Sequence, residues 1–144
     1  MRNFLTTIFV FALLSSAAAK ADDWTHDESV AGLQKFEFSR FVPSGVKRML
    51  EFAYLSNPDC SIPGTIEARK IQEPEHGTVE FANVEGFANY KPDTKFAKCN
   101  DKKVPGVAIN YKSSDGYVGP DNFSVIVMYP NGMAREVRFK MIVR

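Results

Sequence analysis

Residues 123–144 read FSVIVMYPNGMAREVRFKMIVR and contain two strand-like stretches around one turn signal. Apolar and polar side chains alternate before the turn, and they alternate again over residues 137–144. A period of two is typical of a strand that buries one face. The Asn131-Gly132 pair is a strong hairpin signal. These residues therefore predict a β-hairpin.

Shorter stretches of the same kind precede the hairpin, with proline and glycine between them. The expected strands cover residues 36–39, 65–71, 78–81, 87–90 and 107–112. Residues 46–55 fit either a helical or a strand face, and their aromatic content and turn-like flanks favour a strand. About seven to nine short strands without a convincing helix predict an all-β protein, a single immunoglobulin-like β-sandwich.

The first 21 residues have the pattern of a secretory signal peptide. Arg2 is followed by an apolar run over residues 4–14 and by small residues over 15–19. The alternative is a membrane anchor, but the run is about half of the roughly 20 residues that a span needs. Cleavage is expected after Ala19 or Ala21, with the second site favoured. We expect residues 22–33 to form a flexible N-terminal leader, and residues 34–144 to form the domain.

The net charge argues against nucleic-acid binding, and the predicted signal peptide sets the expected location. Cleavage after Ala21 lowers the Lys and Arg count from 18 to 16 and leaves the Asp and Glu count at 17, so the net charge changes from +1 to −1. A near-neutral domain has no bulk attraction for nucleic acid. No second long apolar run follows, so no transmembrane segment is expected after cleavage. The expected location is the periplasm or the exterior.

Both cysteines, Cys60 and Cys99, lie in the part that remains after cleavage. An oxidising compartment favours one internal disulfide between them. Free thiols and an intermolecular bridge are the alternatives. A metal site is disfavoured, because the spacing is unlike zinc-ligand patterns and the chain has only two histidines.

Two segments resemble a known family. Residues 73–79 read EPEHGTV, and residues 111–123 read YKSSDGYVGPDNF. Over roughly residues 65–144 they resemble the Ig-like and cadherin-like modules of bacterial surface proteins. The mature chain is also similar to small exported proteobacterial proteins without an established role, through Pro58-Asp59-Cys60 and Cys99-Asn100. The resemblance implies a β-sandwich and says little about function. A single module, Ser113 in place of a proline and two cysteines are departures from the tandem modules.

The corner formed by Glu73, Glu75 and His76 offers oxygen and nitrogen ligands, and Asp115 and Asp121 add carboxylates. A lone module lacks the neighbouring module that completes a calcium site in tandem arrays. Ser113 or Ser114, His76 and Asp115 are the residue types of a catalytic triad. Their spacing does not support one, and no G-x-S-x-G motif is present. Accordingly, no catalytic residue, metal site or cofactor is expected.

Basic residues mark the last predicted strand, and we interpret them as the solvated outer face of an edge strand: Arg135, Arg138, Lys140 and Arg144. Arg138 and Lys140 are possible contacts for an anionic partner.

The first hypothesis is therefore an exported, non-catalytic Ig-like binding module whose partner is an unknown protein or envelope component. The second is an envelope assembly protein that uses the basic edge strand. The third is a metal-dependent factor or enzyme centred on Glu73, Glu75 and His76.

Overall fold

The computed structural model describes residues 33–144, so the predictions for residues 1–32 lie outside the described part of the chain. Residues 33–144 form seven strands and one short 3-10 helix, η1, in the order β1 (Leu33–Val42), β2 (Arg48–Tyr54), β3 (Glu67–Gln72), β4 (Gly77–Phe87), η1 (Ala97–Cys99), β5 (Lys103–Ser113), β6 (Gly119–Met128) and β7 (Ala134–Val143). This part of the chain contains no helix with the length and apolar character that a bilayer crossing requires.

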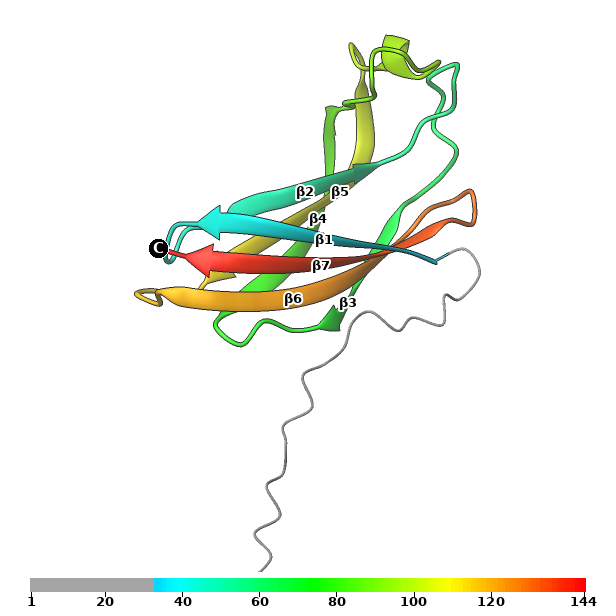
Figure 1. Ribbon diagram of the computed structural model, residues 1–144. Helices are drawn as coiled ribbons and strands as arrows, with labels where there is room; N and C mark the ends of the chain where they lie inside the picture. Colours follow the sequence, from blue (N-terminus) through cyan, green and yellow to red (C-terminus); the bar gives the residue numbers. More distant parts are fainter. Residues whose placement is uncertain (1–32) are drawn as a thin grey trace, which may run out of the picture.

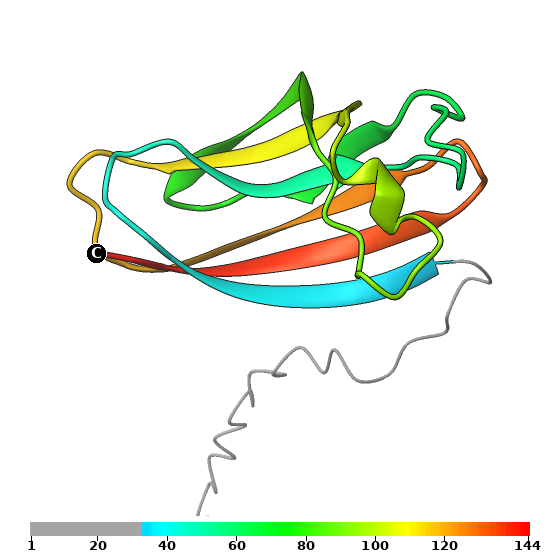
Figure 2. The same ribbon diagram turned by 90° about the horizontal axis from the view of Figure 1, so that it is seen from above.

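The strands form two facing sheets (Figures 1 and 2). One sheet has the order β1-β7-β6-β3 and the other the order β2-β5-β4. These pairings match the seven-strand immunoglobulin arrangement, with the first strand moved beside the last. All pairs are antiparallel except β1 with β7, which run parallel over ten residue pairs. The predicted all-β sandwich with one disulfide is confirmed.

Alternating side chains of β5, β6 and β7 build the core. Tyr129, which the alternation also places on the inward face, is partly buried. The other inward residues of the hairpin are buried, with at most 1% of their surface exposed: Phe123, Val125, Val127, Val137, Phe139, Met141 and Val143. The Phe123 ring stacks on Phe139 at 5.0 Å and on Tyr111 of β5 at 5.9 Å. Aromatic contacts across the two sheets thus join the sandwich halves.

The outer face of the β2-β5-β4 sheet is covered by the Phe52 ring. An ideal Cβ on Gly86 would lie 2.7 Å from this ring, and one on Gly106 would lie 2.5 Å from it. Glycine at both positions lets the ring lie flat across the neighbouring strands. Ala108, opposite Phe52 in the β2–β5 register, is consequently only 3% exposed.

Two sequence predictions about strands can be compared directly with the structure. Residues 48–54 form strand β2, which confirms the strand interpretation of the ambiguous segment. The prediction of a separate strand at residues 87–90 is wrong. Strand β4 runs without interruption to Phe87, because β5 pairs with it at every position from Gly77 to Phe87. The chain then leaves the sheet at Ala88.

The prediction that the basic C-terminal strand is an edge strand is also wrong. Strand β7 lies between β1 and β6, so the edges of its sheet are β1 and β3. Strand β1 adds to β7 in parallel and supplies one acidic partner, Glu37, which lies 2.8 Å from Lys140. Parallel pairing between segments about 100 residues apart leaves no local sequence signal.

Candidate functional site

Three connections gather at one end of the sandwich (Figure 1). They are the β2–β3 loop (residues 55–66), the β4–β5 loop (88–102) and the β6–β7 turn (129–133). We call them together the loop end. An ideal Cβ on Gly64 would lie 2.9 Å from the Cβ of Pro130, so the first and third connections pack closely. The loop end is therefore one continuous surface.

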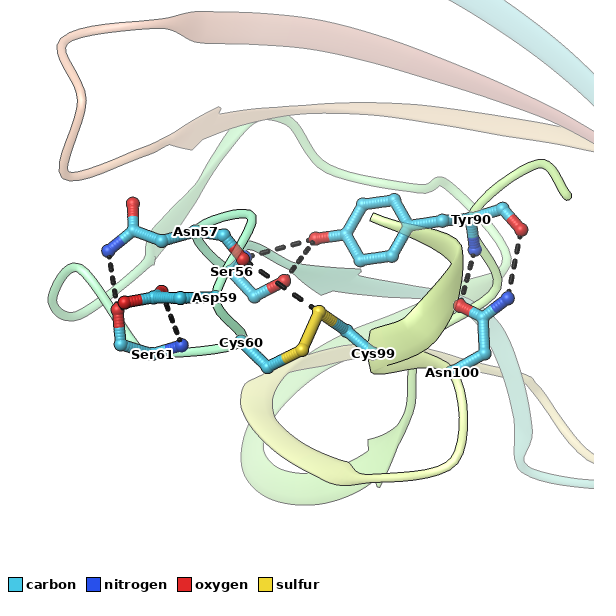
Figure 3. Close-up of a disulfide and its surroundings, with 8 residues drawn as sticks. All are labelled: Ser56, Asn57, Asp59, Cys60, Ser61, Tyr90, Cys99 and Asn100. Carbon is cyan, nitrogen blue, oxygen red and sulfur yellow. Dashed lines mark hydrogen bonds between the residues drawn. A yellow bond between two sulfur atoms is a disulfide. The ribbon is translucent and has the colours of Figure 1, made fainter. Parts of the chain in front are cut away.

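The Cys60–Cys99 disulfide joins the β2–β3 loop to the β4–β5 loop (Figure 3). The S–S distance is 2.04 Å and the Cα atoms are 5.4 Å apart, so the predicted internal bridge is confirmed. Cys99, at the end of η1, is fully buried. Its Sγ lies 3.8 Å from the Asn57 carbonyl oxygen. A disulfide sulfur carries no proton, so this is a van der Waals contact.

The residues around Cys60 form a tight turn. Ser61 donates two hydrogen bonds to Asp59 Oδ1, one from its hydroxyl at 2.6 Å and one from its backbone N–H at 3.0 Å. These bonds lower the pKa of the exposed Asp59 carboxyl below its ordinary value. Cys60, within this turn, has a positive φ of 68°, which is uncommon for a residue other than glycine.

Two tyrosines attach the β4–β5 loop to the end of β2. Tyr90 Oη accepts a hydrogen bond from the Ser56 N–H at 3.0 Å, and Tyr54 Oη accepts one from the Asn89 N–H at 2.7 Å. Asn100 closes the loop on itself, bonding both the N–H and the C=O of Tyr90 at 2.9 Å (Figure 3). The loop is thus fixed by side chains as well as by the disulfide.

A charged pair crosses between the two sheets beside the loop end. Arg135 Nη2 of β7 lies 2.5 Å from Glu51 Oε1 of β2, and both side chains are largely buried. Burial raises the pKa of the neighbouring Tyr129 to about 12, because the phenolate would be poorly solvated there. Sequence reasoning missed this pair, because it treated Arg135 as an outward residue of an edge strand.

The predicted Glu73-Glu75-His76 corner lies at the opposite end of the sandwich. There the buried carboxylate of Asp121 accepts hydrogen bonds from the N–H groups of Glu75 and His76, at 3.0 and 3.2 Å. It also accepts one from Tyr111 Oη at 2.7 Å. Burial and this carboxylate both raise the pKa of Tyr111 above its ordinary value. We call this arrangement the corner end.

Among the side chains of this corner, His76 Nε2 lies 4.0 Å from Glu75 Oε2, and the other contacts are with neighbouring residues. Glu73 lies 2.6 Å from Lys70, and the His76 ring stacks on Tyr117 at 4.0 Å. Ser113 Oγ accepts the Gly45 N–H at 2.9 Å, and Asp115 lies 3.3 Å from Lys112, so the triad drawn on paper is not assembled. In residues 33–144 no group of three or more His, Cys, Asp or Glu side chains is arranged to hold a metal ion.

The two possible anion contacts, Arg138 and Lys140, project from the outer face of β7. They line a shallow hollow of about 450 Å³ together with Gln72 and Asn122. Lys140 is paired with Glu37, which neutralises its charge locally. The structure places these two residues near each other and on a different face from the loop end.

Comparisons with known proteins add little to this geometry. No family model and no curated protein matches the chain. Amebosin, solved in solution, is 11% identical, and the match covers 76% of this chain and 97% of amebosin with a TM-score of 0.43. PbICP-C, solved in complex with falcipain-2, is 9% identical, and the match covers 81% of this chain and 95% of PbICP-C with a TM-score of 0.33. Both are weak similarities. The described residues define the class as a disulfide-linked, seven-stranded β-sandwich.

Proposed function

We propose that this chain is an exported, non-catalytic Ig-like module that binds a protein or another envelope component through its loop end. The observation that carries the proposal is the covalent link between two of the three connections at that end. Loops at the end of a rigid sandwich are the usual binding elements of such folds. A loop that is ordered before binding loses less conformational entropy when the partner arrives.

The side chains of the loop end suit contact with a partner. Ile62 is 40% exposed and Met133 is 44% exposed, although both are apolar. They lie on different connections of the loop end, the first in the β2–β3 loop and the second in the β6–β7 turn. Exposed apolar side chains on a rigid, polar-rimmed surface are typical of protein interaction sites.

Export is supported by two independent features of the chain. Residues 1–21 have the signal-peptide pattern. The disulfide is a kind of bond that persists in oxidising compartments and is rare in the cytosol. To test export, the full chain is expressed with a C-terminal tag in a bacterium that has a periplasm. We expect a periplasmic product whose N-terminus is Lys20 or Asp22. An uncleaved product that stays in the cytosol would refute this part of the proposal.

Binding is tested with two matched variants of the tagged protein. Met133→Asp places a charge on the loop end, and Val118→Asp places the same charge on an exposed apolar residue of the β5–β6 loop at the corner end. Both are used to capture partners from the exported fraction of the organism that encodes the chain. We expect specific partners to be lost with Met133→Asp and kept with Val118→Asp. Equal capture by both variants would contradict a loop-end site.

A further inference from the structure

Strand β4 presents a free edge. It pairs with β5 on one side, and within residues 33–144 no strand pairs with its other side. The Ser114 N–H donates to the His76 carbonyl at 2.7 Å, which makes positions 76 and 114 a directly bonded pair of this ladder. Because bonding alternates along an antiparallel pair, the odd-numbered residues of β4 direct their N–H and C=O groups to the free edge. Asn83, Glu85 and Phe87 are three of them.

An apolar hollow of about 500 Å³ lies beside the second half of this edge. Ile62, Gly64 and Ile66 form one wall, and the ends of β4 and β5 form the other, with Pro105 and Val107. It is lined mainly by apolar surface, and Phe87 is 60% exposed at the end of the same strand. Unpaired backbone groups beside an apolar hollow are the two elements of recognition by strand addition.

The charges beside the hollow indicate which kind of segment would bind there. Asn83 and Glu85 also line the hollow, and among the described residues Glu85 has no ion-pair partner. The next carboxylate along β4, Glu80, is by contrast bound to Lys47. A cationic side chain of an incoming segment would therefore find an unpaired carboxylate at the rim.

We propose that an extended segment of a partner protein adds to β4 as a further strand, with an aliphatic side chain in the hollow and a lysine or arginine two residues away. Side chains two positions apart on a strand share a face, so one segment can fill the hollow and reach Glu85 together. The main chain of the segment bonds to Asn83, Glu85 and Phe87. The inference deepens the proposed binding function, because Ile62 and Gly64 belong to the loop end.

The test uses a blocked synthetic peptide of about eight residues, with leucine and lysine alternating at the inward positions and threonine between them. A second peptide has the same sequence, but the backbone amides that would donate hydrogen bonds to β4 are N-methylated. Binding to the processed protein is followed by amide NMR shifts. We expect the shifts to concentrate at residues 83–87, and we expect the N-methylated peptide to bind at least tenfold more weakly, since it cannot complete the ladder.

Variants of the protein test each contact separately. Asn83→Pro removes an edge N–H and leaves the bonds to β5, because proline is tolerated where the N–H faces solvent. We expect this variant and Glu85→Lys each to weaken binding about tenfold, roughly 1.4 kcal/mol. Ile62→Ala should weaken it several-fold, whereas Ile142→Ala, with a similarly exposed isoleucine on β7, should leave it unchanged. If Asn83→Pro does not fold, the N-methylated peptide removes the same bonds from the ligand side.

The proposal is overturned if the parent peptide does not bind at millimolar concentration, if both peptides bind equally, or if Ile142→Ala weakens binding as much as Ile62→Ala. Such results leave the loop-end function standing when Met133→Asp still loses its partners. Conversely, peptide binding at β4 with unchanged capture by Met133→Asp would support strand addition and contradict the wider loop-end site.

Discussion

The two ends of the sandwich are held together by different chemistry. At the loop end, a disulfide and the Tyr90 hydroxyl tie long connections to one another. At the corner end, one buried carboxylate, Asp121, gathers the N–H groups of Glu75 and His76 and the hydroxyl of Tyr111. The first arrangement fixes loops that project from the sheets, and the second closes a short turn against the sheet. The difference is that the loop end fixes exposed loops by a covalent bond, whereas the corner end closes a turn through hydrogen bonds to a buried carboxylate.

The contrast also changes the meaning of the sequence resemblance. The histidine-glycine corner looks like a ligand site when only residue types are considered. In the structure, Glu75 and His76 contribute backbone N–H groups to Asp121, and Gly77 leaves room for the Tyr111 ring, which an ideal Cβ would approach to 2.6 Å. The motif therefore encodes a way of turning the chain. Residue types alone do not distinguish a turn-forming corner from a ligand-binding site.

Removal of the disulfide should have the largest effect. For the Cys60→Ser/Cys99→Ser variant we expect the free energy of unfolding to fall by about 4 kcal/mol. The bridge lowers the conformational entropy of the unfolded chain, and its removal restores that entropy. Urea unfolding of the processed protein measures it. Cys60→Gly/Cys99→Ser should recover about 1 kcal/mol, since glycine adopts the positive φ at this position without strain. A loss below 1 kcal/mol in the serine variant would show that the loops hold without the bridge.

The Asp121→Asn variant should have the next largest effect. It removes the charge and turns one acceptor into a donor that faces other donors, so we expect a loss of about 2 kcal/mol. The exposed carboxylate Asp115 provides the matched control, and Asp115→Asn should change stability by less than about 0.5 kcal/mol. Equal effects of the two substitutions would mean that the corner end does not depend on its buried carboxylate.

The sequence predicted the fold better than it predicted the site, and the reason is physical. The alternation over residues 123–143 is local, and it identified the inward side chains of β6 and β7. The disulfide followed from two cysteines in a chain that the sequence predicts to be exported. The parallel pairing of β1 with β7 depends on residues far apart in the sequence, so the edges of the sheets were misplaced. The Glu51–Arg135 pair joins the two facing sheets, and the hollow beside β4 is lined by the β2–β3 loop and the ends of β4 and β5. Both bring together residues far apart in the sequence, so no local pattern marks them.

Removal of single hydroxyl groups should give smaller, separable effects at the two ends. Tyr90→Phe deletes the acceptor of the buried Ser56 N–H, so we expect a loss of about 1 kcal/mol and faster hydrogen exchange at Ser56. Tyr117→Phe at the corner end deletes a donor to the exposed Pro120 carbonyl, which water can replace. We therefore expect less than about 0.5 kcal/mol for Tyr117→Phe. The reverse order would contradict the role of Tyr90 in fixing the β4–β5 loop.

The smallest effect should appear on acidification, at the Asp59 turn of the loop end. Hydrogen bonds from Ser61 lower the pKa of Asp59, so the stability they contribute is present above the ordinary carboxyl pKa of about 4 and is lost as the pH falls through the lowered value. At the corner end the pKa of Tyr111 is raised, so its contribution is present below about pH 10 and is lost only as the pH rises further. Between about pH 5 and 2, Ser61→Ala should therefore show a flatter loss of stability than the wild type. An NMR titration should place the pKa of Asp59 higher in that variant, which keeps the backbone N–H bond and loses the hydroxyl bond. An unchanged pKa would mean that the Ser61 hydroxyl does not bond to Asp59.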